Sequence, residues 1–205
     1  MNDVKLIWIT PNAQAVTAYC GRVSNPANQD NHDTADKLLR YLQKNKHWSP
    51  FEMASMCLEI ITPRDVARQI LRHRSFSFQE FSQRYAVVDT FTTRECRLQD
   101  DKNRQNSIPV QDRELGRFWQ EQQQDVLSAA KKAYNNALNA GIAKEVARSV
   151  LPEGLAVSRM YVSGTIRSWL HYCEVRTDAS TQKEHRDIAN KCQVILKREM
   201  PALFE

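Results

Sequence analysis

The feature that most limits the possible fold is one long helical pattern in the second half of the chain. From about Asp112 to Ala140, apolar and small side chains recur with the 3.6-residue period of an α-helix, and Gly141 follows as a natural end. The residues on the repeating face are Leu115, Phe118, Trp119, Gln122, Val126, Ala130, Ala133, Tyr134 and Ala137. A stripe of this kind is usually packed inside a protein, so we expect it to form part of the core.

The other elements are shorter and lack the strict strand–helix alternation of a doubly wound sheet. We expect strands at 5–10, 53–62, 85–92 and 156–164, and helices at 33–45, 63–74, 143–154, 165–176 and 180–200. In the helix at 63–74, Thr62 is the expected N-cap, Pro63 the first helical residue and Asp65 a box-like cap. Residues 94–111 are expected to form a mobile loop. The pattern predicts an α+β fold, with residues 1–205 forming one helix-rich domain around a small, mostly antiparallel sheet.

Composition restricts the kinds of site that the chain can build. It has five glycines, and neither G-x-G-x-x-G nor G-x-x-x-x-G-K-[ST] occurs, so a nucleotide would have to be held by side chains. The net charge of +5 rests on 18 arginines and 11 lysines, with no basic run longer than two. Arginines dispersed among acidic residues indicate discrete anion pockets more than a continuous track for a polyanion.

The sequence also predicts the compartment. No apolar run approaches the roughly 20 residues that span a bilayer, and the first residues do not resemble a signal peptide. The five cysteines are scattered and form no C-x-x-C pair, as is typical of free thiols in a reducing compartment. We expect a cytoplasmic protein without a membrane partner.

Most familiar catalytic motifs are missing. His32-Asp33 has no second H-D pair and no H-E-x-x-H to support it, so no metal site is predicted and a metal-dependent phosphohydrolase is only an alternative. There is no G-x-S-x-G. Ser82 has no evident general base nearby, which favours a hydrogen-bond donor to a ligand over a nucleophile.

The stretch RHRSFSFQEFSQRY, residues 72–85, is the most informative part of the sequence. It starts at the expected C-terminal end of a helix, where the dipole does not favour an anion, so an anion there would depend on the arginines. Arg148, Arg167 (four residues before His171) and Arg176 stand in similar settings. Together they indicate a pocket for several anionic groups. A nucleic-acid-binding module, in which the phenylalanines stack on bases, is the alternative.

The same stretch carries a resemblance to a known family. R-H-R followed by seven residues and a serine, here Arg72-His73-Arg74 and Ser82, resembles the signature of the flavin-dependent thymidylate synthases. The similarity covers essentially the whole chain and is clearest in 47–85 and 147–176. The flanking motifs stand in the order expected of that family: SPFE, ARQILRHR, ARSVLP and SGTIRSWLHYCEVR.

The resemblance implies a methyltransferase that converts dUMP into dTMP. Methylenetetrahydrofolate would supply the carbon, and FAD reduced by NADPH would supply the hydride. It also implies a homotetramer with active sites where subunits meet, and no nucleic-acid partner. An arginine would activate the pyrimidine, because the chain lacks the Pro-Cys-His motif of the older thymidylate synthases.

The family's site residues can be carried over by position. Arg176 is the predicted catalytic residue, holding the uracil edge. The predicted FAD-binding residues are Ser49, Arg72, His73, Arg74, Glu80, Thr165, Ile166, Arg167 and His171. The predicted dUMP-binding residues are Gln69, Arg72, Glu80, Phe81, Ser82, Gln83, Arg84, Arg148 and Arg176. The residues expected on the folate and hydride-donor side are His47 and Tyr85.

One departure from the family pattern leaves the substrate open. Ser180 or Thr181 stands where many relatives carry a histidine. Relatives that act on other pyrimidine nucleotides, or that add hydroxymethyl instead of methyl, would share most of these residues.

Overall fold

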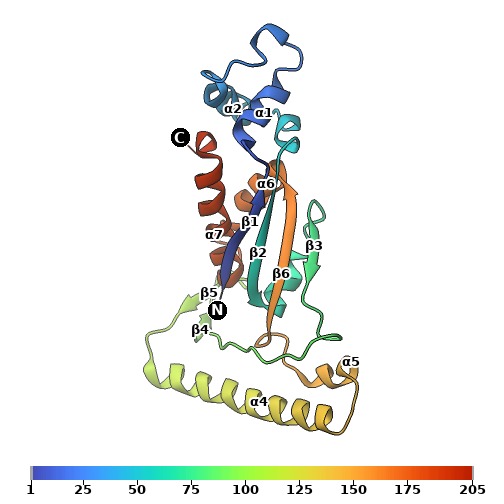
Figure 1. The fold of residues 1–205 in the computed structure, drawn as a ribbon. Coiled ribbons are helices and arrows are strands. Elements are labelled where there is room, and N and C mark those ends of the chain that lie inside the picture. Colours follow the sequence, from blue (N-terminus) through green and yellow to red (C-terminus); the bar gives the residue numbers. More distant parts are fainter. Residues whose placement is uncertain (1, 205) are drawn as a thin grey trace.

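The computed structural model describes residues 2–204, and its centre is a four-stranded antiparallel sheet (Figure 1). The strands follow the order β1-β2-β6-β3, each antiparallel to its neighbour. Their bounds are Asp3–Ile9 (β1), Ser55–Pro63 (β2), Val157–Thr165 (β6) and Ser77–Glu80 (β3). The predicted α+β class with a small antiparallel sheet is confirmed, as are three of the four expected strands.

Helices surround this sheet unequally (Figure 1). Two of them, α6 (Ile166–Arg176) and α7 (Lys183–Glu199), pack against the sheet. Near one end of the sheet lie α1 (Ala13–Gly21), α2 (Ala35–Lys44) and the 3-10 turn η2 (Ser49–Glu52). The remaining elements are η1 (Pro26–Asn28), α3 (Arg64–Ile70), β4 (Arg97–Gln99), β5 (Ser107–Pro109), α4 (Arg113–Asn139), α5 (Lys144–Ala147), η3 (Arg148–Val150) and η4 (Pro201–Leu203). None of the helices among residues 2–204 is both long and apolar enough to cross a membrane.

The main core lies between the sheet and α6 and α7. Met56, Leu58 and Ile60 alternate along β2 and are fully buried, as the two-residue period of a strand requires. Trp169 of α6 is buried with them and donates its indole N–H to the carbonyl of Met56 over 3.0 Å. The inward-facing residues expected on α7 are confirmed as buried: Ile188, Cys192 and Ile195.

The expected start of α3 is wrong. Thr62 and Pro63 still belong to β2, where they pair with β6. The first N–H groups of α3 are satisfied by backbone instead, since Arg64 donates to the carbonyl of Ala156 and Asp65 to that of Glu153. A side-chain cap is therefore unnecessary. The helix also ends at Ile70, short of the expected residue 74.

The strand expected at 85–92 is not a member of the sheet. The edge of β6 is taken by β3, which lies inside the 72–85 stretch. The later residues form only an isolated bridge between Phe91 and Ala156, and the N–H of Val88 donates to the hydroxyl of Tyr134 on α4. The expected loop 94–111 contains a small hairpin, in which β4 pairs with β5.

The long helix α4 is confirmed, but only part of its predicted apolar stripe is core. Asp112 caps it by accepting from two backbone N–H groups, and Gly141 follows with a φ of 78°. The second half of α4 is anchored by Tyr134, which is 1% exposed. In the first half Phe118 is 55% and Trp119 40% exposed. The reason is visible in Figure 1: α4 lies beyond the end of the sheet, so the sheet cannot cover this face.

Candidate active site

Separate segments of the chain meet around His73, just beyond α3. Arg176, the last residue of α6, donates from Nε to Nε2 of His73 over 2.9 Å. The ring of Tyr172 stands edge-on to His73 with centroids 5.0 Å apart. Burial lowers the pKa of His73 to about 4, and nearby positive charges, with Arg176 first among them, act in the same direction. His73 is therefore neutral near pH 7 and accepts a hydrogen bond at Nε2.

This contact orients the predicted catalytic arginine. His73 engages only Nε of Arg176, so the two terminal nitrogens of the guanidinium are not used by this contact. No further side-chain hydrogen bond or ion pair of Arg176 occurs among residues 2–204. A planar fork of N–H donors can hold a carbonyl or anionic ring edge in one geometry.

The buried cysteines are poor nucleophiles. Cys173 lies on α6 one turn before Arg176 and is 2% exposed, and burial raises its pKa to about 12. Burial also raises the pKa of Cys57 and of Cys192. Such thiols are protonated at neutral pH and unreactive.

A cavity of about 520 Å³ opens near the N-terminal end of α6. Thr165 caps this helix by accepting the N–H of Ser168 over 3.2 Å. A helix N-terminus with nearby cations stabilises phosphate, and an aromatic ring offers a face for a flat group. The lining residues supply all three and fit the predicted FAD site: Lys46, Trp48, Glu52, Ser75, Arg167, Ser168, His171 and Glu174.

The other predicted FAD residues do not line this cavity, and they differ in exposure. Ser49 follows Trp48 at the start of η2, and Arg72 and Arg74 are exposed on either side of His73. Ile166 is fully buried, and its backbone N–H donates to the carbonyl of Ala54.

The second half of the 72–85 stretch lies at the other end of β3. Ser82, Arg84 and Tyr85 line a separate cavity of about 340 Å³ with residues 143–145. Arg148 begins η3 directly after α5. No lining residue is shared between this cavity and the one near α6. With a rise of about 3.3 Å per residue, β3 alone separates the two ends by about 10 Å. The predicted dUMP residues therefore fall into two groups within one chain.

Glu80, at the end of β3, is held by the protein itself. Its carboxylate pairs with Arg64 at 3.4 Å and with Arg68 at 3.0 Å, and it accepts from the hydroxyl of Ser158 at 2.8 Å. Arg84 pairs with Glu145 at 2.9 Å, and both side chains are exposed. A ligand must compete with the partners of Glu80 and Arg84 or share them.

The remaining predicted residues are mostly at the surface. His47 and Phe81 are exposed, and Tyr85 is 86% exposed. Gln83 differs, because it is 5% exposed and its amide nitrogen has no hydrogen-bond partner among the described residues. Ser180 donates to Asp178 over 2.6 Å in the α6–α7 connection.

Three residues near this site were not predicted from the sequence. Gln182, Glu184 and His185, at the start of α7, connect to Gln69 of α3 by hydrogen bonds. They are more than 110 residues from Gln69 along the chain, and no local period or motif marks them. The only sign in the sequence is that they follow Ser180 and Thr181, where the chain departs from the family pattern.

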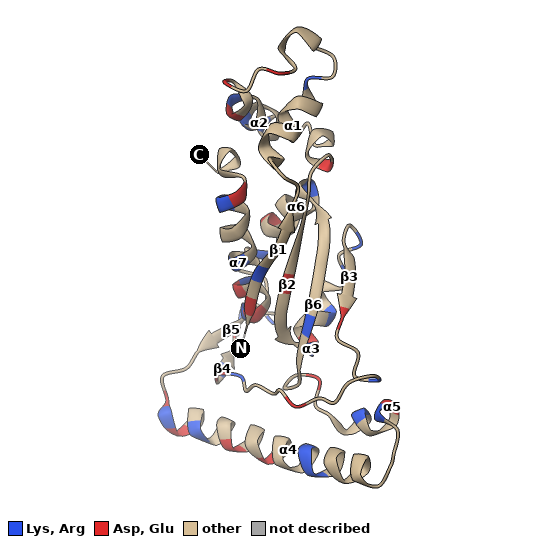
Figure 2. Cartoon of the chain, viewed as in Figure 1, with Lys and Arg blue, Asp and Glu red and all other residues tan. Residues whose placement is uncertain are grey.

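Charge is interspersed over the molecule (Figure 2). Lys and Arg alternate with Asp and Glu along α4 and α7, with no single basic stripe in this view. This distribution favours discrete anion pockets over a nucleic-acid track. Among residues 2–204 no cluster of three or more His, Cys, Asp or Glu side chains is arranged to hold a metal ion.

Comparison with known proteins decides the family. A family model described as thymidylate synthase complementing protein matches residues 5–202. The chain belongs to this family. It is 49% identical over 192 residues to the "Probable flavin-dependent thymidylate synthase" of Paramecium bursaria Chlorella virus 1, covering 93% of this chain and 88% of that protein. It is 47% identical over 190 residues to the flavin-dependent thymidylate synthase of Synechocystis, covering 93% and 87%.

The fold of this family member is also similar to a solved structure. The UMP/dUMP methylase PolB from Streptomyces cacaoi, bound with 5-Br dUMP, has a TM-score of 0.88 at 25% identity, covering 99% of this chain and 93% of that one. A second structure of that methylase, bound with 5-Br UMP, has a TM-score of 0.87. The resemblance inferred from residues 72–82 is confirmed.

Proposed function

We propose that this chain is a flavin-dependent thymidylate synthase that converts dUMP into dTMP. The observation that carries the proposal is the meeting of the signature with Arg176: His73 of the R-H-R motif accepts a hydrogen bond from the arginine expected at the uracil edge. The family membership, the two relatives that bear this name and the UMP/dUMP methylase bound with 5-Br dUMP support the same conclusion.

The chemistry assigned to Arg176 follows from its geometry. Uracil C5 becomes a carbon nucleophile only when electron density enters the ring. A guanidinium at the ring edge stabilises the developing negative charge, an effect of a few kcal/mol for one well-placed donor. Neutral His73 holds Nε of Arg176, so the guanidinium plane is set before the nucleotide binds. The buried thiols near the site are protonated, which leaves this role to the arginine.

The residues near α6 are suited to hold FAD. Arg167 and His171, with Ser49 and the N-terminal end of α6, would face the phosphates. Arg72 and Arg74 would add positive charge. When bound, FAD reduced by NADPH would supply the hydride, and methylenetetrahydrofolate would supply the carbon. His47 and Tyr85 are exposed and available to the folate side.

We infer that a second chain completes this site. One chain places Arg176 and His73 on one side of β3 and Ser82, Arg84 and Arg148 beyond its other end. Ser82 and Arg84 line a cavity that shares no lining residue with the cavity near α6, which supports a site completed by residues of two chains. The exposed apolar face of α4 offers a surface for association. We therefore keep the homotetramer, with sites between subunits and residues 1–205 as one domain, as part of this proposal. A cytoplasmic location stays a prediction.

The direct test is turnover. Purified protein is supplied with dUMP, methylenetetrahydrofolate, NADPH and FAD, and the product is identified by mass. A gain of one methyl group supports the proposal, and the same assay with UMP and a search for hydroxymethyl product define the substrate. No product, and no flavin binding after addition of FAD, would refute it. Arg176→Ala should lower kcat at least 100-fold, and full activity would exclude its catalytic role.

Subunit sharing has its own test. Arg176→Ala and Arg148→Ala are each expected to be inactive, because each removes one of the two groups. Mixed assemblies formed by co-expression should regain activity, since some sites then combine an intact group from each chain. Absence of recovery in mixed assemblies of confirmed composition would show that one chain supplies the whole site.

A further inference from the structure

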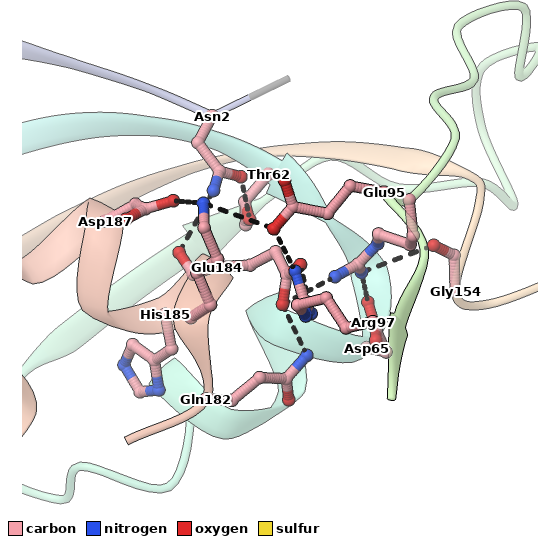
Figure 3. Close-up of polar contacts among 12 residues, drawn as sticks. Asn2, Thr62, Asp65, Glu95, Arg97, Gly154, Gln182, Glu184, His185 and Asp187 are labelled. Carbon is pink, nitrogen blue, oxygen red and sulfur yellow. Dashed lines mark hydrogen bonds and ion pairs between the residues drawn. The ribbon is translucent and has the colours of Figure 1, made fainter. Parts of the chain in front are cut away.

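Glu184 at the start of α7 is a buried carboxylate with several polar partners (Figure 3), and it lines neither of the two cavities described above. Glu184 is 8% exposed and sits between two arginines from the segment before α4, with Arg94 at 3.1 Å and Arg97 at 2.7 Å. Burial by itself would raise the pKa of this carboxyl, but hydrogen bonds from Gln182 and Arg97 and the charge of Arg94 lower it to about 2. Glu184 is therefore ionised and can only accept hydrogen bonds.

Because Glu184 can only accept, it fixes the orientation of the Gln182 amide, which in turn fixes that of the Gln69 amide. Gln182 must turn its NH₂ group toward Glu184, to which it donates over 3.0 Å. Its carbonyl oxygen then faces Gln69 and accepts from that residue's NH₂ group over 2.6 Å. The oxygen of Gln69 in turn faces Nδ1 of His185, 3.2 Å away. An acceptor at that position requires the hydrogen of His185 on Nδ1.

The series of hydrogen bonds ends at Tyr172, whose hydroxyl can donate to His185. With its hydrogen on Nδ1, His185 accepts at Nε2, and the hydroxyl of Tyr172 lies 3.1 Å away to donate. His185 is 0% exposed, so bulk solvent does not contact its ring. Tyr172 also packs against His73. All donors therefore point in one direction, from Tyr172 to Glu184.

We propose that Glu184 and Gln182 are positioning residues for the nucleotide site, which set the orientation of the Gln69 amide and the tautomer of His185. The inference rests on the proposed function only in taking Gln69 as a nucleotide contact. Two hydrogen-bonding positions of the Gln69 amide are used within the protein, and one N–H and one lone pair remain. If the Gln69 amide were flipped, the free N–H and the free lone pair would exchange places. The amide orientation therefore decides whether Gln69 presents a donor or an acceptor to the edge of a pyrimidine nucleotide.

The first experiment measures dUMP binding to the full-length FAD-loaded protein by titration calorimetry. Gln182→Leu keeps the ion pairs of Glu184 but breaks the series at its second member. We expect dUMP to bind about tenfold more weakly, with FAD affinity unchanged. Asp187→Asn on the same helix is the matched control, because the ion pair of Asp187 is with the half-exposed Lys183 and not with the Glu184 series. Its effect on dUMP binding should be below about twofold.

A double-mutant cycle separates positioning from general stability. If Gln182 acts through Gln69, then Gln182→Leu should have no further effect on dUMP binding in a Gln69→Leu background. Additive losses, or a Gln182→Leu variant that binds dUMP like the wild type, would overturn the proposal. If the wild-type protein itself binds no dUMP, the proposed function fails instead.

A second measurement needs neither substrate nor turnover. The ¹⁵N chemical shifts of labelled histidine, assigned with a His185→Asn variant, report which ring nitrogen carries hydrogen. The wild type should show His185 with hydrogen on Nδ1, and Gln182→Leu or Glu184→Gln should give a mixture of tautomers. Hydrogen on Nε2 in the wild type, or an unchanged signal in both variants, would refute the role of Glu184 and Gln182.

Discussion

The sheet with α6 and α7 and the α4 arm are stabilised in different ways. Both contain a tryptophan, but Trp169 of α6 is 1% exposed in a continuous core, while Trp119 of α4 is 40% exposed. The small cluster that anchors α4 consists of Val88, Tyr134, Ala147, Leu151 and Ala156. The sheet can therefore bury its apolar surface within one chain. The arm keeps apolar surface available for another chain.

The difference matters for function because the proposed site draws on both regions. His73 and Arg176 belong to the sheet region, whereas Ser82, Arg84 and Arg148 lie toward the arm and α5. If the arm associates with another chain, assembly and formation of the site are the same event. The following predictions test how far the two regions differ.

The largest effect is expected from removing a core tryptophan. Trp169→Ala should lower the free energy of unfolding by about 3–5 kcal/mol, because a large buried side chain and its hydrogen bond to Met56 are lost. Urea denaturation measures the change. Trp119→Ala is the control: if the exposed face of α4 associates with another chain as proposed, its effect on the unfolding temperature should depend on protein concentration. If both variants lost the same stability at every protein concentration, the two regions would not differ in the way described.

Acid should weaken the sheet region through His185. Burial, with the charges of Arg176 and His73, lowers the pKa of His185 from 6.5 to about 3. Between these values the unfolded chain binds a proton that the folded chain excludes, so stability is complete above about pH 6.5 and is lost as pH falls. The slope is at most about 1.4 kcal/mol per pH unit for this group. Urea denaturation at pH 7, 6 and 5 should show the decline, and His185→Asn should reduce it; an unchanged slope would contradict the assignment.

Replacing a glycine of the sheet should have an intermediate effect on stability. A Cβ added at Gly164 of β6 would lie 2.6 Å from a ring carbon of Phe76, whose ring is packed against Trp169 with centroids 4.5 Å apart. Gly164→Ala should therefore destabilise the protein by about 1–3 kcal/mol. Thermal unfolding tests this, and a variant as stable as the wild type would mean that Phe76 moves freely.

The smallest effect is expected in the arm and has the opposite sign. Gly116 lies inside α4, and a Cβ there meets no atom within 4 Å. Gly116→Ala should stabilise α4 by about 0.5–1 kcal/mol, because glycine loses more backbone entropy in a helix. Hydrogen exchange of α4 amides should slow. Destabilisation would indicate that another chain approaches the helix closely at this residue.

Local patterns predicted the elements and the family better than they predicted the contacts between distant residues. The bounds of α4 and the inward face of α7 followed from the helical period, and the signature at 72–82 pointed to the family before any fold was known. The strand at 85–92 failed because a period of two cannot show that β3 already occupies the edge of β6. The cap at Thr62 failed because the carbonyls of Ala156 and Glu153, distant in sequence, satisfy the helix start.

By itself, the sequence determined which side chains are available: arginines and histidine in a glycine-poor chain, a long amphipathic helix, and no exposed catalytic cysteine motif. Only the tertiary structure decided which of them meet. Arg176 reaches His73 across 103 residues, and Glu184 directs Gln69 through Gln182. Hydrogen-bond direction depends on neighbours within about 3 Å in space, and distance along the chain does not encode that.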